Sequence, residues 1–122
     1  RMTLVDNSEF PLHRSSLGLA LLHRTYGRRS VAHIEASVRR GTGRGPDAAA
    51  LFDRVEKSVR RRGCVVLRRT GRNLLNVAVV CDAPCGPLAL AAFTDKADVG
   101  LETLLDRLRA AARNLEDDLR GR

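Results

Sequence analysis

The sequence predicts an α+β fold: a four-stranded sheet with two helices on one face, in the order β-α-β-β-β-α, preceded by an N-terminal arm and a short helix. Three observations lead to this prediction. Apolar residues alternate over residues 31–39, three apolar runs separated by turn residues follow between residues 64 and 95, and leucines recur at helical spacing near the end. Alternation is typical of half-buried strands, and i, i+3, i+4 spacing is typical of amphipathic helices.

The chain length predicts one core. Its 122 residues are enough for a single hydrophobic core and too few for two full domains. We therefore expect residues 1–30 to be an N-terminal extension and residues 31–122 to be one β-α-β-β-β-α domain. In the extension, Pro11 interrupts a polar start, and the short apolar stretch 17–22 predicts a short helix that ends in the basic, turn-prone stretch 26–30.

The first predicted strand and first core helix occupy residues 31–62. The strand is predicted from strict alternation, with one set of residues on one side: Ala32, Ile34, Ala36 and Val38. After the loop 40–46, Asp47 stands where a helix N-cap is expected. The helix stripe has helical spacing and consists of Leu51, Phe52, Val55 and Val59. Gly63 is predicted to end this helix as a C-cap glycine.

The remaining elements are an antiparallel meander and a long helix. The apolar runs 64–69, 74–82 and 88–95 are separated by the turn-forming stretches 70–73 and 83–87. One face of the middle strand is predicted to hold Leu75, Val77, Val79 and Cys81, and one face of the last strand Leu88, Leu90 and Ala92. The final helix is predicted from Leu101, Leu104, Leu105, Leu108, Ala112, Leu115 and Leu119. Asp98 is its predicted N-cap, and Gly121 its stop.

The charge of the chain favours a polyanionic partner. The formal net charge is +8, and between Arg28 and Arg72 there are thirteen basic residues against four acids. Such asymmetry is typical of a phosphate-binding face, and scarce aromatic residues favour recognition of RNA shape and backbone over stacking on bases. Arginines on a solvated surface are the plainer alternative. The predicted RNA-binding residues are Arg39, Arg40, Arg44, Arg54, Lys57, Arg60, Arg61, Arg62, Arg68, Arg69, Arg72, Arg107 and Arg113.

The sequence gives no sign of an enzyme, a cofactor or a metal site. Cys81 and Cys85 lie four apart without a second pair, which falls short of a zinc signature. The glycine-rich stretch 41–46 lacks the lysine and hydroxyl residue of a nucleotide-binding loop. An odd number of cysteines argues against a disulfide framework, so we expect a reducing compartment, the cytoplasm or an organelle matrix. No apolar run approaches the roughly 18 to 20 residues of a membrane span.

The order of predicted elements resembles the ribosome hibernation factors, the family of hibernation-promoting factor and ribosome-associated inhibitor A. The resemblance covers residues 31–122 and rests on the strands 77–80 and 88–93, the turn between them, and the helix ending Leu-Glu-Asp-Asp-Leu-Arg at 115–120. It implies a non-catalytic factor, of hibernation or assembly type, that binds ribosomal RNA of the small subunit and regulates translation by occupying the channel for messenger and transfer RNA. The residues it assigns to RNA are Arg54, Lys57, Arg60, Arg61 and Arg62 on the first helix and Arg107 and Arg113 on the last.

Two alternatives stay open at the level of sequence. One is a regulatory interaction module of the kind appended to protein kinases, which would bind anionic lipid or an acidic protein partner through the same basic surface. The other is that the apolar stretch 17–22 in the N-terminal extension forms a homo-oligomer or partner interface.

Overall fold

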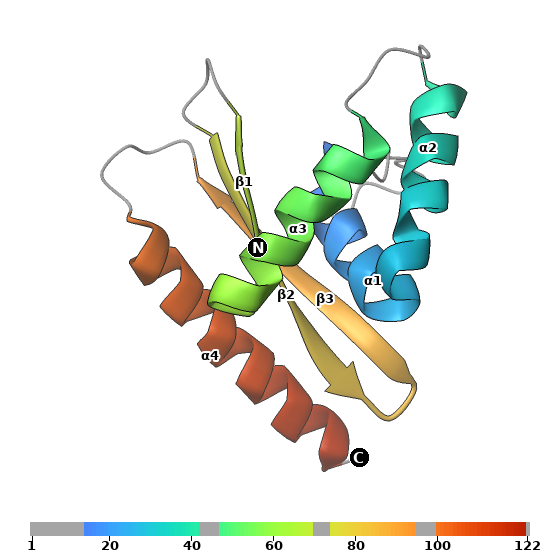
Figure 1. The fold of residues 1–122 in the computed structure, drawn as a ribbon. Helices are drawn as coiled ribbons and strands as arrows, with labels where there is room; N and C mark the ends of the chain where they lie inside the picture. The colour runs from blue at the N-terminus through green and yellow to red at the C-terminus, as the bar shows by residue number, and fades with distance from the viewer. Residues whose placement is uncertain (1–13, 42–46, 70–73, 95–99, 122) are drawn as a thin grey trace.

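The computed structural model describes residues 14–41, 47–69, 74–94 and 100–121. The fold is α+β, as predicted (Figure 1). In chain order the elements are α1 (Ser16–Tyr26), a 3-10 turn η2 (Gly27–Arg29), α2 (Ser30–Arg40), α3 (Ala48–Arg62), β1 (Val65–Arg69), β2 (Leu74–Ala83), β3 (Gly86–Thr94) and α4 (Leu101–Arg120).

The three strands form one antiparallel sheet in the order β1-β2-β3, which confirms the predicted meander. Val65 of β1 lies opposite Ala78 of β2. The β2–β3 hairpin pairs Ala83 with Gly86 across a tight turn, and Gly86 has φ of +127°. A side chain is strained at that φ, so a glycine suits this position. The other predicted turn, 70–73, lies outside the described residues.

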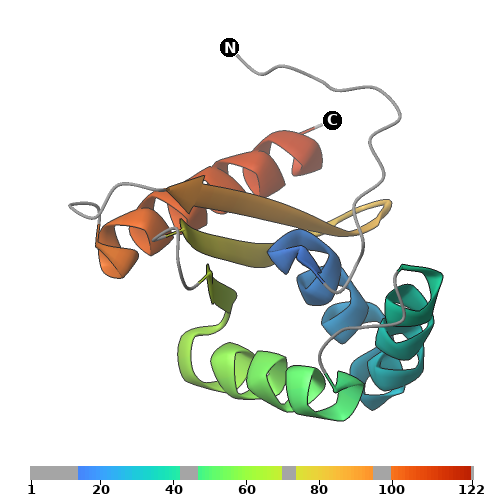
Figure 2. The same ribbon diagram turned by 90° about the horizontal axis from the view of Figure 1, so that it is seen from above.

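Helices cover both faces of the sheet, and the prediction of two helices on a single face is wrong. Figure 2 shows the sheet between α4 on one face and the helices α1 to α3 on the other. The physical reason is that β2 is apolar on both of its faces, which is typical of a strand buried on both sides. The alternate residues predicted to share a face, Leu75, Val77, Val79 and Cys81, do so and pack with Leu105, Leu108 and Ala112 of α4. On the opposite face Ala78 packs with α1 and α3.

The predicted strand at residues 31–39 is wrong, because these residues lie in α2. Ser30, Ile34 and Ser37 are the buried residues of α2, and they follow helical spacing. Val31 and Val38 are partly buried beside them. The apolar residues of this stretch therefore fit both the two-residue period of a strand and the 3.6-residue period of a helix. Its alanines, glutamate and arginines have a high helix propensity, which favours the helix. Without this strand, the sheet of the described residues has three strands instead of the predicted four.

The two amphipathic helices that flank the sheet are confirmed. In α3 the side chain of Asp47 accepts hydrogen bonds from the backbone N–H groups of Ala49 and Ala50, and Gly63 ends the helix with φ of +71°. In α4 the N-cap residue is Gly100, which makes no side-chain cap hydrogen bond, instead of the predicted Asp98. Asp98 itself lies outside the described residues. Gly121 follows the last residue of α4, as predicted.

Helix α1 confirms the short helix predicted at 17–22 and belongs to the same core as the elements after residue 30. Leu19, Ala20 and Leu22 are buried with residues of α2, α3 and β1, and Leu17 is the exposed leucine of the stretch. The Ser30 hydroxyl donates a 2.8 Å hydrogen bond to the carbonyl oxygen of Leu22, which joins α2 to α1. Most of the stretch 17–22 therefore packs against its own chain, while Leu21 is half-buried and Leu17 exposed. A partner interface at this stretch stays a prediction. Residues 1–13, the predicted arm, lie outside the described residues.

Candidate ligand-binding site

A cavity of about 180 Å³ lies where α1, α3, β1 and the second half of β2 meet. It lies between α1 and α3, on the face of the sheet opposite α4. The residues that line it are Ala20, His23 and Arg24 of α1, Val59 of α3, Gly63 and Cys64 of the α3–β1 connection, Val65 of β1, and Ala78, Val80 and Asp82 of β2.

The inner wall of the cavity is aliphatic and well packed. Ala20, Val65 and Ala78 are buried, with 3%, 1% and 0% of their surface exposed. Val59 and Val80 are partly buried against the same cluster. Ala20 and Ala78 have short side chains, so the wall leaves space that larger side chains would fill. The wall therefore suits the apolar body of a small molecule.

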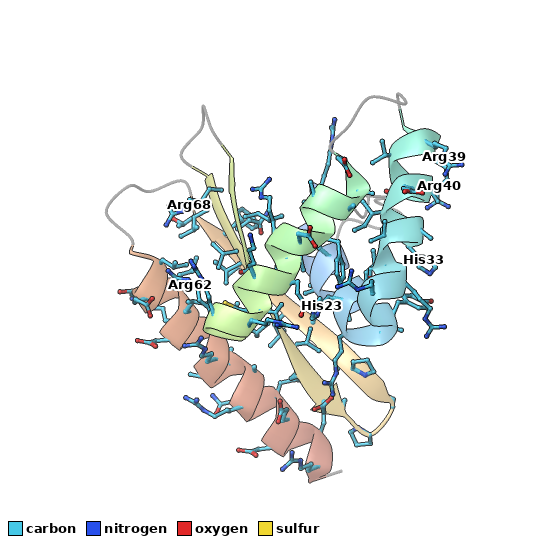
Figure 3. All side chains as sticks on the ribbon, viewed as in Figure 1. His23, His33, Arg39, Arg40, Arg62 and Arg68 are labelled. Carbon is cyan, nitrogen blue, oxygen red and sulfur yellow. The ribbon has the colours of Figure 1, made fainter. Side chains whose placement is uncertain are left out.

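His23 supplies one polar group of the cavity, and its ring is held in place from two sides. Figure 3 labels it in the central part of the molecule, and its ring stacks on Phe52 with a centroid separation of 5.9 Å. Its Nε2 atom lies 2.8 Å from Oε2 of Glu56 on α3. Glu56 also accepts a hydrogen bond from Arg60, and its pKa is lowered, first by the hydrogen bond with His23 and then by that with Arg60.

Arg24, the next residue of α1, supplies the second polar group. Its Nη2 atom donates a 2.6 Å hydrogen bond to Oδ1 of Asp82, near the end of β2. Both side chains are largely exposed, 54% for Arg24 and 70% for Asp82. This ion pair therefore joins α1 to the β2–β3 hairpin at the solvent side of the cavity.

Cys64 brings a thiol to the cavity, and this thiol is buried. The residue is 2% exposed, and desolvation raises the pKa of the thiol above its ordinary value. A nucleophilic cysteine needs the thiolate form, so this thiol is suited to packing. Its backbone is fixed by Ser58, whose hydroxyl donates to the Cys64 carbonyl oxygen at 2.7 Å and accepts from the backbone N–H of Val66 at 3.1 Å.

The described residues that were predicted to bind RNA come from α2, α3, β1 and α4. Arg39 and Arg40 lie at the end of α2, far from Arg62 and Arg68, which point toward α4 (Figure 3). The remaining cations of α3, Arg54, Lys57, Arg60 and Arg61, are exposed, as are Arg107 and Arg113 of α4. Arg44 and Arg72 lie outside the described residues, and Arg69 is described only in its backbone, as the last residue of β1.

Several of these cations are neutralised within the chain. Arg39 pairs with Glu35 at 3.5 Å and Arg60 with Glu56 at 2.9 Å. Arg62 pairs with Glu102 of α4 at 2.9 Å, and Arg109 donates a hydrogen bond to the carbonyl oxygen of Arg62. These last contacts join α3 to α4. The basic residues thus take part in holding helices together, a role that charge counts along the sequence do not show.

The sequence analysis missed the cavity residues. His23, Arg24 and Asp82 were not predicted as site residues, and Arg24 and Asp82 lie 58 positions apart. No local motif joins residues from α1, α3 and β2, so only packing of the elements brings them together. Within the described ranges, no cluster of three or more histidine, cysteine, aspartate or glutamate side chains is placed to hold a metal ion.

No protein-family model matches the sequence, and no curated protein matches it. Solved structures that share the fold include the following two. One is described as an IclR transcriptional regulator from Silicibacter sp. TM1040, with a TM-score of 0.70, 22% identity, and coverage of 97% of this chain and 49% of that chain. The other is an IclR homolog from Microbacterium hydrocarbonoxydans in complex with 4-hydroxybenzoate, with a TM-score of 0.67, 25% identity, and coverage of 98% of this chain and 52% of that chain. The chain thus spans about half the length of each structure.

These matches overturn the resemblance to ribosome hibernation factors. The predicted function in RNA binding, ribosome hibernation and translation regulation is wrong, and the kinase-type regulatory module is not supported either. The structural reason is the order of elements, since α1, α2 and α3 precede all three strands of the described sheet. No helix in the described parts of the chain is long and apolar enough to cross a membrane. The fold of this chain is similar to about half of an IclR-type transcriptional regulator.

Proposed function

We propose that this chain is the ligand-sensing part of an IclR-type transcriptional regulator, and that it binds a small organic acid without chemically changing it. The observation that carries the proposal is the cavity between α1, α3 and the sheet, which combines an aliphatic wall with the cation of Arg24. The similar structure in complex with 4-hydroxybenzoate supports the class of ligand, because that molecule has an apolar ring and a carboxylate.

The size of the cavity restricts the ligand. Its volume of about 180 Å³ is below the roughly 300 to 1,000 Å³ that is typical of pockets for drug-sized ligands. A single aromatic ring or a short aliphatic chain with one anionic group would suit it. The aliphatic wall removes apolar surface from water, and Arg24 at the solvent side binds the anionic group.

The side chains that line the cavity favour ligand binding over catalysis. The cavity thiol, Cys64, has a raised pKa because of burial, so it is not an activated nucleophile. The His23 ring bonds Glu56 through Nε2 and stacks on Phe52, which fixes its position in the wall. In a ligand-responsive regulator, occupancy of such a cavity is the signal, and a change in packing of the surrounding elements transmits it.

The proposal is tested by isothermal titration calorimetry of the chain with 4-hydroxybenzoate, benzoate and short aliphatic acids. We expect saturable one-to-one binding by one or more of them. Val59→Phe would fill the cavity and abolish the binding, whereas Val38→Phe would leave it intact. Both valines are partly buried helical residues packed against the same core cluster, but only Val59 lines the cavity.

Two outcomes would overturn the proposal. One is the absence of binding heat for every acid at millimolar concentration. The other is undiminished binding of the acid by Val59→Phe while this variant keeps the far-ultraviolet circular dichroism of the parent, since the acid would then bind outside the cavity.

A further inference from the structure

Two side chains with nitrogen donors line the cavity from consecutive positions of α1, and each contacts a carboxylate from another element. His23 contacts Glu56 of α3, and Arg24 contacts Asp82 of β2. The two pairs differ in exposure. The side chains of His23 and Glu56 are 19% and 30% exposed, whereas those of Arg24 and Asp82 are 54% and 70% exposed.

The Glu56 carboxylate is the more firmly held of the two. Oε2 contacts the His23 ring and Oε1 accepts from Arg60, so both of its oxygens are engaged. Asp82 contacts Arg24 through one oxygen, Oδ1, and one guanidinium nitrogen, Nη2. The guanidinium group has five N–H donors in a planar fork that suits two carboxylate oxygens at once. The bond to Asp82 therefore leaves other N–H donors of Arg24 available. These donors can bind a second carboxylate, or a carboxylate that contacts two guanidinium nitrogens at once.

Replacing Asp82 at Arg24 requires little free energy. Exposed ion pairs contribute little to stability, because water screens the charges and ordering two side chains costs entropy. Asp82 is 70% exposed, so its carboxylate regains water when it leaves Arg24. A ligand carboxylate presented from the cavity would be shielded from water on its apolar side, where the interaction with Arg24 is screened less.

We propose that Asp82 is an exchangeable counter-ion: the carboxylate of the bound ligand replaces the Asp82 carboxylate at Arg24. This inference rests on the proposed function and adds the residue that selects anionic ligands. Because the Arg24–Asp82 bond joins α1 to the end of β2, the exchange also removes a tie between α1 and the β2–β3 hairpin. Ligand binding thereby loosens the hairpin tip around Pro84 and Cys85 relative to α1.

The exchange is tested with two probes of the same shape, 4-hydroxybenzoate and its uncharged amide, 4-hydroxybenzamide. Arg24→Gln removes the cation, and we expect it to weaken binding of the acid about tenfold or more, since hydrogen bonds to charged groups contribute about 1.5 to 3 kcal/mol. Binding of the amide should change little.

Asp82→Asn removes the competing carboxylate, and we expect it to tighten binding of the acid about two- to fivefold. Arg113→Gln, an exposed arginine of α4 on the other face of the sheet, is the control and should leave both affinities unchanged.

A second measurement, hydrogen exchange of backbone amides, reports on the β2–β3 hairpin. Saturation with 4-hydroxybenzoate should speed hydrogen exchange of the amides at the β2–β3 turn, and Asp82→Asn should show faster exchange there without ligand. Because Arg24 and Asp82 are largely exposed, these variants are expected to fold.

The outcomes separate the two proposals. If no acid binds the parent chain, the ligand-sensing function is wrong, and the proposed replacement of Asp82 at Arg24 is wrong as well. If the acid binds the parent but Arg24→Gln leaves its affinity unchanged, or Asp82→Asn weakens it, the cavity function stands and the exchange is wrong.

Discussion

The hydroxyl of Ser16 donates a 2.8 Å hydrogen bond to the side-chain oxygen of Asn76, sixty residues later in the chain. Ser16 is the first residue of α1 and is 1% exposed, and Asn76 lies on β2 on the same face of the sheet as Ala78. The bond therefore fixes the start of α1 over the sheet. The end of α1, where His23 and Arg24 line the cavity, depends on this anchoring.

Replacing Ser16 with alanine should lower the free energy of unfolding by about 1 to 2 kcal/mol, because a partly buried acceptor on Asn76 loses its partner. Urea denaturation of Ser16→Ala, Asn76→Ala and the double variant gives the coupling between the two side chains. A coupling energy indistinguishable from zero would show that the bond contributes nothing to stability.

Replacing Gly63 with alanine should destabilise the protein by about 1 to 2 kcal/mol, which is the cost of the left-handed conformation for a residue with a Cβ atom. Gly63 has φ of +71°, and an added Cβ would meet no atom of the rest of the fold within 4 Å, so the penalty comes from the local backbone conformation. Thermal unfolding provides the measurement. Gly121→Ala is the matched control, because Gly121 has φ of −75° and an added Cβ there makes only ordinary contacts. Equal effects at both sites would contradict this interpretation.

The three cysteines should differ sharply in reactivity toward Ellman's reagent. All three are unpaired; Cys64 and Cys81 are buried and Cys85 is exposed at the β2–β3 turn. Burial raises the pKa of both buried thiols, which lowers the fraction of reactive thiolate. We expect one thiol to react quickly in the native protein and two more to react only after addition of denaturant. Cys85→Ser should remove the fast phase, and a fast phase that survives in this variant would contradict the assignment.

Stability should fall in acid partly because of Glu56. Its pKa in the folded protein is below the ordinary value of 4.5, mainly because of the hydrogen bond with His23. A group with a lowered folded-state pKa stabilises the fold above its unfolded-state pKa, and that contribution is lost as the pH falls through the folded-state value. Glu56→Gln should therefore flatten the pH dependence of unfolding free energy from pH 4.5 downward. Asp53→Asn, an exposed change on the same helix, serves as the control; an unchanged slope in Glu56→Gln would refute the prediction.

The elements whose apolar residues repeat with a single clear period were predictable from the sequence. The stripe from Leu51 to Val59 and the leucines of α4 match only a helix, and the alternate residues of β2 and β3 lie on the faces predicted for them. Asp47 and Gly63 were recognised as caps because local chemistry alone explains their preference. The stretch around Ile34 failed because its apolar residues satisfy a strand and a helix equally, and contact with α1 and α3 decides between them.

The sequence by itself determined the α+β class, the hairpin, the two amphipathic helices and both caps of α3, since each depends on residues within a few positions of one another. Only the tertiary structure decided that helices cover both faces of the sheet, that the basic residues spread over several elements, and that His23, Arg24 and Asp82 meet around one cavity. Such contacts join residues tens of positions apart, and they form because burying several apolar surfaces at once allows few arrangements of the elements. No pattern within a single segment records which arrangement that is.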